Sequence, residues 1–309
     1  MDILMVGHSR SGKTSYMAGL YKLFGNKPEG FGIRIFDSDK SQNLKLIGDN
    51  VVRGIYPNGT DIASEYCFWL QYDNSLLIPF NWYDYRGGAL SESSKQSPEA
   101  AQLVRKIDEA DALIVFLDGG KITKMTDYDL KSEYDILIWS ILKSISKKSS
   151  NGTYFPVSFV ITKGDLYSNE NILYDSKGFK YFIPVITNIA KSSVSVGMIG
   201  IVKVSKKGIS NVFAPLIFSL YYGMHHYIDE RIKSIDATIA RCNNLDPSLF
   251  DDVFSFIFGC KSDRESVEDA IQTIKEEKED LNKLSALSDV MYTKLNYFVK
   301  NRKIKIIKS

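Results

Sequence analysis

Cysteine and histidine are scarce in this chain, and neither residue forms a cluster. The three cysteines, Cys67, Cys242 and Cys260, have neither the spacing of a metal site nor the density of a disulfide scaffold. Of the three histidines, His225 and His226 are adjacent and His8 stands alone. We therefore expect no cysteine or histidine metal centre and no histidine catalytic pair, and a reducing cytoplasm is the predicted location.

Long apolar runs and an excess of one charge are also absent. The longest apolar runs, such as Leu113–Leu117 and Val212–Tyr222, are too short to span a bilayer. The first residues already read as a strand, so no signal peptide is expected. Lysine and arginine number 39 against 37 acidic residues, which gives no general case for nucleic-acid binding. The length of 309 residues allows one large core or two domains.

The first motif lies at the N-terminus. An apolar run, Ile3–Val6, precedes the sequence G-H-S-R-S-G-K-T at residues 7–14, and the helical stretch Ser15–Phe24 follows. G-x-x-x-x-G-K-T between a strand and a helix is typical of a phosphate-binding loop, in which backbone N–H groups point inward at a helix N-terminus. The motif predicts a nucleotide-binding protein. The residues expected at the nucleotide are Gly7, Ser9, Ser11, Gly12, Lys13, Thr14 and Ser15, with the Lys13 charge at the β- and γ-phosphates and the Thr14 hydroxyl on Mg²⁺.

A second motif indicates which base is bound. Residues Pro156–Thr162 read as a buried parallel strand, and Thr162-Lys163-Gly164-Asp165 stands at its carboxyl end, where open α/β sheets place their ligands. This resembles the [N/T]-K-x-D guanine signature of GTPases. The Asp165 carboxylate can accept hydrogen bonds from the guanine N1–H and amine, the Lys163 stem can lie over the base, and Thr162 stands where Asn is more frequent. A solvated turn is the alternative.

Between these motifs, the apolar run at residues 75–84 ends in Asp84-Tyr85-Arg86-Gly87, which matches D-x-x-G. Thr60 precedes another strand-like run, Ile62–Tyr72, and Asp73-Asn74 is predicted to join the two runs as an antiparallel hairpin. A plain turn at residues 57–60 is the alternative interpretation of Thr60.

The order of these motifs resembles a Ras-like GTPase of the translation-factor-related P-loop class over residues 1–225. The resemblance implies GTP and GDP as ligands with Mg²⁺. It also implies that Thr60 and Asp84 hold the metal and that Thr60 and the Gly87 N–H contact the γ-phosphate. The layout also looks like the bacterial double-GTPase group. For the base-capping loop, Ala190, in Thr187–Lys191 after a predicted strand at Phe182–Ile186, is the first candidate, and Ile199–Ser205 competes with it.

Two departures from this family concern hydrolysis. The residue after the D-x-x-G glycine is often a Gln that orients water, but it is Gly88 here. The loop carries Arg10 in the pattern seen in guanylate-binding-protein and atlastin-like GTPases, where the arginine acts as a built-in finger. Arg10 pointing into solvent is the alternative, and Arg86 is a second cation near the motif. The catalytic residues predicted are Arg10, Lys13, Thr60 and Gly87.

Alternating strands and helices predict an α/β fold with a doubly wound, mostly parallel sheet and a C-terminal helical appendage. We expect a strand at Ala112–Asp118, helices at Ser97–Glu109 and Tyr128–Lys147, a helix-compatible stretch at Phe31–Phe36 and a loop at Lys147–Gly152. The second helix is expected to carry Ile136, Trp139, Leu142 and Ile145 on one face.

The predicted domains are a GTPase domain at residues 1–225 and a helical region at 226–309. Helices are expected at Tyr227–Arg241, Pro247–Phe258 and Glu265–Lys300, the last with a capping box at Ser262 and Glu265. The basic end, Lys300–Lys308, is expected to be a solvated tail or to touch acidic lipid.

The leading functional hypothesis is a GTP-hydrolysing switch, slow or partner-dependent. A protein effector is expected to bind the switch segments or the C-terminal helices, and oligomerisation is left open. The alternatives are a GTP-dependent interaction module that does not hydrolyse GTP, and an ATPase.

Overall fold

The computed structural model describes residues 1–27, 30–58, 64–72, 75–84, 98–150, 155–169, 171–191, 195–225, 228, 233, 264–301 and 304–307. Among these residues, no helix combines the length and the apolar character needed to cross a membrane. The chain divides into two units. Unit 1 comprises Met1–Gly223 and Met291–Ser309, and unit 2 comprises Met224–Val290.

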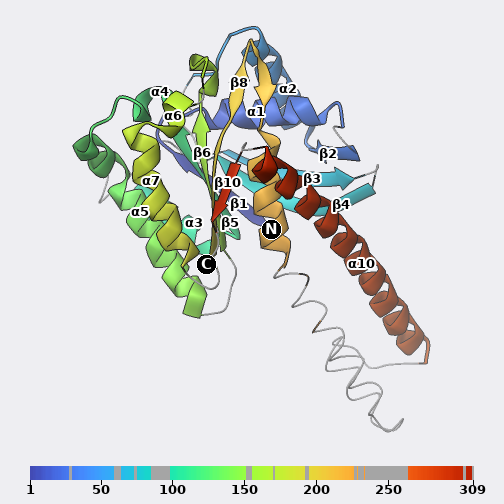
Figure 1. The fold of residues 1–309 in the computed structure, drawn as a ribbon. Coiled ribbons are helices and arrows are strands. Elements are labelled where there is room, and N and C mark those ends of the chain that lie inside the picture. Colours follow the sequence, from blue (N-terminus) through green and yellow to red (C-terminus); the bar gives the residue numbers. More distant parts are fainter. Residues whose placement is uncertain are drawn as a thin grey trace. The chain divides into compact units, whose positions relative to one another are not determined.

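Unit 1 is built on an eight-stranded sheet (Figure 1). Its spatial order is β10-β7-β6-β5-β1-β4-β3-β2. The five central strands are parallel: β4 (Ser75–Asp84), β1 (Asp2–Gly7), β5 (Ala112–Asp118), β6 (Phe155–Thr162) and β7 (Ser195–Ile201). Antiparallel strands extend both edges: β3 (Ser64–Tyr72) and β2 (Phe31–Arg34) on one side, and β10 (Ile304–Ile307) on the other. The predicted mostly parallel α/β sheet is confirmed.

Helices cover both faces of this sheet because the central strands are apolar on both sides. In β1, Leu4 and Val6 join the core beneath α3 (Pro98–Glu109), α5 (Asp127–Ser150) and α7 (Lys177–Ala190). Ile3 and Met5 are equally buried on the opposite face, where α1 (Lys13–Phe24) and α2 (Ser38–Val52) lie (Figure 1). The short elements are α4 (Gly119–Ile122), η3 (Gly164–Leu166), α6 (Asn171–Tyr174) and the hairpin of β8 (Lys203–Ser205) and β9 (Gly208–Ser210).

Most elements predicted within unit 1 are confirmed. They include the buried strands at β5 and β6, the β3–β4 antiparallel pair and the helices α3 and α5. The turn at Asp73-Asn74 lies outside the described residues.

Several local predictions are wrong. Residues Phe31–Arg34 form strand β2 instead of a helix, because Phe31 and Ile33 alternate with Gly and Arg and are buried against the sheet. The loop predicted from Lys147 is helical to Ser150, since the Lys148 stem is buried and its Nζ donates to the Ala110 carbonyl at 2.8 Å. On α5, Ile145 is buried as predicted and Ile136 and Leu142 pack partly buried against the core, but Trp139 is 62% exposed. The fully buried face also includes Leu130, Tyr134, Leu137 and Ile141.

The C-terminal residues differ most from the prediction. α10 runs from Arg264 to Lys300, which confirms the predicted long helix. The basic end is not a tail in its described part: Ile304–Ile307 forms β10 and pairs antiparallel with β7, so the region after residue 225 is not purely helical. The helix predicted at Pro247–Phe258, most of the one at Tyr227–Arg241, and Ser262 of the capping box lie outside the described residues.

Candidate nucleotide site

The predicted phosphate-binding loop connects β1 to α1. Gly12 caps the helix with φ of 89°, a conformation that favours glycine. Close packing leaves room only for a glycine at Gly7, because a Cβ atom there would lie 2.6 Å from the Phe116 carbonyl oxygen. Arg10 adopts φ of 62°, which is uncommon for a residue with a side chain. The sequence therefore folds locally into the tight curl that a phosphate cradle requires.

Lys13 lies inside this curl. Its Nζ donates to the carbonyl oxygens of Gly7 at 3.0 Å and His8 at 3.3 Å. The side chain is only 5% exposed, and burial lowers the pKa of Lys13 from its ordinary value while the nearby Asp84 carboxylate opposes that shift. A buried ammonium group with mainly neutral carbonyl partners favours an added anion, since anionic charge would offset its desolvation.

Thr14 and Asp84 meet beside the loop. β1 and β4 are parallel, and their register places Met5 opposite Asp84, so both strands end at the same edge. The Thr14 hydroxyl donates to Asp84 Oδ2 at 2.9 Å, and Asp84 is 1% exposed. A hydroxyl and a carboxylate next to a phosphate cradle suit Mg²⁺, which is commonly held by one or two carboxylates, phosphate oxygens and water. No group of three or more acidic, histidine or cysteine side chains is placed to hold a metal within the described part of the chain.

The second motif meets the first through a buried hydrogen bond. Thr162 ends β6, and its hydroxyl donates to the Ser11 carbonyl oxygen at 2.7 Å, with the Leu117 carbonyl oxygen as a second, longer acceptor at 3.1 Å. Lys163 then turns the chain with φ of 57° and forms an ion pair with Asp118. Asp118 ends the neighbouring strand β5, opposite Thr162 in the register. The two loops are thus fixed to each other at the carboxyl edge of the sheet.

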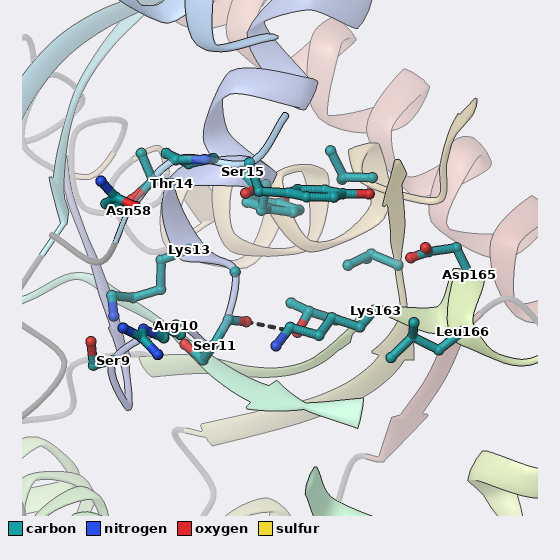
Figure 2. A pocket seen from close by; sticks show the side chains of 17 residues that line it. Ser9, Arg10, Ser11, Lys13, Thr14, Ser15, Asn58, Lys163, Asp165 and Leu166 are labelled. Atoms are coloured by element: carbon teal, nitrogen blue, oxygen red, sulfur yellow. Dashed lines mark hydrogen bonds between the residues drawn. The ribbon is translucent and has the colours of Figure 1, made fainter. Parts of the chain in front are cut away.

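One cavity of about 380 Å³ connects both motifs. Ser9, Arg10 and Lys13 lie toward one end and Asp165 and Leu166 toward the other, as Figure 2 shows. The cavity is also lined by six more residues that the sequence predicted as nucleotide contacts: Ser11, Gly12, Thr14, Ser15, Thr162 and Lys163.

Other lining residues were not predicted from the sequence. Tyr56 and Asn58, from the segment after α2, line the cavity. Burial raises the pKa of Tyr56, and the Asp165 carboxylate adds to the shift, which places this phenol near the carboxylate. Asp118 was also missed, although its place at the end of a buried parallel strand was a usable signal.

The base-capping prediction needs correction. The strand predicted at Phe182–Ile186 is wrong, because these residues belong to α7, which Ser176 caps by accepting a hydrogen bond from the Phe179 N–H. Ala190 is buried at the end of that helix and is not among the residues that line the cavity. The competing segment reaches it: the Gly164 N–H donates to the Val202 carbonyl at 3.3 Å, and Val202 and Val204 line the cavity.

Thr60, Arg86, Gly87 and Gly88 lie outside the described residues, so the roles given to them stay predictions. Asn58, which precedes Thr60 by two positions, is described and lines the cavity near Thr14 (Figure 2).

His8 faces away from the predicted phosphate position and toward α5. Its Nε2 lies 3.0 Å from the Glu133 carbonyl oxygen and 3.7 Å from Glu133 Oε1, and its ring packs edge-on against Tyr134 at 5.1 Å between centroids. Burial lowers the pKa of His8, and the Glu133 carboxylate opposes the shift. The second residue of the loop therefore anchors it to the neighbouring helix.

No protein-family model matches the sequence, and no curated protein matches it. Solved structures similar to it include the signal recognition particle receptor SRb-GTP/SRX complex from Chaetomium thermophilum (12% identity, 53% of this chain and 71% of that chain, TM-score 0.32). The Ski7 GTPase-like domain of S. cerevisiae, bound to GDP and inorganic phosphate, is similar at 17% identity over 67% of this chain, with a TM-score of 0.38, but only 43% of that chain is covered. An ADP-ribosylation factor-like GTP-binding protein/small COPII coat GTPase SAR1 from Encephalitozoon cuniculi, in complex with GDP, matches at 13% identity (75% of this chain and 82% of that chain, TM-score 0.34). Because each TM-score is below 0.5, these likenesses say nothing about what this chain binds.

Proposed function

We propose that this chain binds a guanine nucleotide with Mg²⁺ in the cavity, hydrolyses GTP to GDP and phosphate, and acts as a nucleotide-dependent switch. The observation that carries the proposal is the Thr162–Ser11 hydrogen bond of 2.7 Å. It holds the loop bearing Asp165 at a set position relative to the loop bearing Lys13, with one cavity between them. Lys13 and Asp165 therefore lie toward opposite ends of one cavity (Figure 2), which supports an anion at one end and a guanine base at the other.

Each end has its own chemistry in this proposal. The N–H groups at the start of α1 and the Lys13 ammonium bind the β- and γ-phosphates. Asp165 accepts from the guanine N1–H and amine, a pair of donors that adenine does not present. Thr14 and Asp84 would hold Mg²⁺, which neutralises phosphate charge when it is bound. Thr60 and the Gly87 N–H are proposed to contact the γ-phosphate.

Arg10 is the proposed source of transition-state stabilisation. It lines the phosphate end of the cavity beside Lys13 (Figure 2). A guanidinium there can offset charge that develops on the transferred phosphoryl group. Since Gly88 has no side chain to orient water, a GTP-dependent binding module without hydrolysis is the second candidate.

The decisive experiment replaces Asp165 with Asn and measures the affinities for GTP, XTP and ATP by fluorescence titration. Loss of a charge-assisted pair costs on the order of 2 kcal/mol, so GTP affinity should fall about 30-fold. XTP affinity should rise, because xanthine carries a carbonyl where guanine carries its amine.

Asp127→Asn, at the exposed start of α5, controls for the loss of a surface charge. Unchanged GTP affinity in the Asp165 variant refutes guanine recognition, and tight ATP binding by the unmodified protein points to an ATPase. Single-turnover assays with labelled GTP then separate the hydrolysing switch from the binding module.

A further inference from the structure

Unit 2 is connected to unit 1 by two helices. Residues 213–225 are helical and cross from unit 1 into unit 2 after Gly223. α10 crosses back between Val290 and Met291 without a break. A continuous helix transmits a displacement of one end to the other far better than a flexible linker does. A change in the contacts that these two helices make within unit 1 can therefore be transmitted to unit 2.

The start of the first connecting helix is held by the helix of the nucleotide site. Tyr16 follows Thr14 by two residues in α1 and is completely buried. Its hydroxyl donates to the Val212 carbonyl at 2.7 Å, and the Leu216 backbone also forms a hydrogen bond with it. Breaking this contact would leave buried polar groups without hydrogen-bond partners, which is energetically unfavourable. Hence α1 and the start of residues 213–225 are expected to move together.

The same side chain contacts the strand that carries the proposed Mg²⁺ ligand. The Tyr16 ring packs edge-on against Trp82, with 5.9 Å between centroids, and Trp82 precedes Asp84 by two residues in β4. Tyr16 therefore lies in the helix that carries Thr14 and contacts the strand that carries Asp84. A shift of α1 or of β4 on nucleotide exchange would reach it.

The second connecting helix rests on the first. Phe213 packs against Phe24 of α1 at 5.0 Å and against Phe298 of α10 at 6.3 Å between ring centroids. Further along, Tyr221 and Tyr292 stack at 5.8 Å. The helix entering unit 2 and the helix leaving it thus share one aromatic cluster built on α1.

We propose that Tyr16 is a positioning residue that couples the nucleotide state of the site to the two helices connected to unit 2, and that unit 2 is the part of the chain that reports which nucleotide is bound. This inference rests on the proposed function. A nucleotide can shift the protein from one conformation to another only if it binds the two conformations with different affinity. GDP and a GTP analogue must therefore be compared.

The test is hydrogen–deuterium exchange of the full chain saturated with GDP or with a non-hydrolysable GTP analogue, with affinities first measured for every variant. We expect exchange in residues 213–225 and 264–300 to differ between the two nucleotides by about threefold or more. Tyr16→Phe, which removes only the hydroxyl, should reduce that difference to less than half.

Tyr21→Phe is the matched control. Tyr21 is also buried in α1, but its hydroxyl pairs with Ser41 of α2 at 2.8 Å, so this variant should keep the full difference. If Tyr16→Phe does not fold, Phe298→Leu weakens the aromatic cluster instead and is judged by the same criterion.

The outcomes separate this inference from the proposed function. Tight binding of both nucleotides without an exchange difference in these helices overturns the coupling alone. A difference that Tyr16→Phe leaves intact, or that Tyr21→Phe removes equally, also overturns it. Failure to bind either nucleotide overturns the proposed function and this inference with it.

Discussion

Replacing Thr162 with Val tests the connection between the two loops directly. Valine has nearly the same shape as threonine, so the close packing against Gly12, where an added Cβ would lie 3.3 Å from Thr162 Cβ, is kept while the donor is lost. The Ser11 carbonyl then loses a buried donor at 2.7 Å. A buried acceptor left unsatisfied costs about 1–3 kcal/mol. For a unit of this size, each kcal/mol lowers the melting temperature by about 2–4 °C.

The assay is thermal unfolding together with GTP titration. We expect the melting temperature to fall by at least about 2 °C. We also expect the GTP dissociation constant to rise about fivefold or more, because the ligand must then fix a loop that the free protein no longer holds. Thr162→Ser keeps the hydroxyl and should restore most of both quantities.

Ser158→Ala is a matched control on the same strand. Ser158 is completely buried in β6, and its hydroxyl has no hydrogen-bond partner among the described residues. Its removal should therefore be neutral or slightly stabilising. If Thr162→Val and Ser158→Ala change the melting temperature and the dissociation constant alike, the hydrogen bond does not position the loops and the reasoning is refuted.

Further predictions concern Lys13, Thr14, Arg10 and His8, which lie in the loop between β1 and α1 or at the start of α1. Lys13→Ala should abolish tight triphosphate binding, and Thr14→Ala should remove its Mg²⁺ dependence; EDTA without effect on GTP affinity in the unmodified protein would contradict the metal assignment. Arg10→Ala should slow single-turnover GTP hydrolysis by about a hundredfold or more with little change in GTP affinity, and a parallel loss of both would make Arg10 a binding residue. Burial lowers the pKa of His8, so below about pH 6.5 the unfolded chain binds a proton more readily than the folded chain. The melting temperature should fall on acidification through that region, and less steeply in His8→Gln; identical pH profiles would show that His8 does not contribute.

The site was predictable where ligands follow parallel strands. Asp84 and Thr162 end strands β4 and β6, and Lys13 follows β1 after the loop of residues 8–12. Parallel strands bring their carboxyl ends to one edge of the sheet. Sequence spacing alone therefore placed these residues together. Asp118 at the end of β5 follows the same rule and could have been included.

The base end of the cavity was less predictable, because its walls come from segments without a motif. Tyr56 reaches the cavity only because α2 carries the chain back toward α1, and nothing in its sequence neighbours signals a contact near Asp165. In α7, residues 182–186 read F-I-P-V-I, an apolar run that fits a strand or a buried helix equally well. The Ser176 cap and the core contacts of Phe182 and Ile186 stabilise the helix.

Strand β10 shows how a distant partner decides local structure. Its sequence, I-K-I-I, is rich in isoleucine, which favours a strand, but four residues within a basic segment are too short a signal to predict one. The partner is β7, with Ile304 opposite Gly200, roughly a hundred residues earlier in the chain. β7 leads into Val202 and Val204, which line the cavity. The C-terminal strand therefore supports the strand that leads into one wall of the cavity. Both chain connections to unit 2 lie, in sequence, between strands β7 and β10 of the unit 1 sheet.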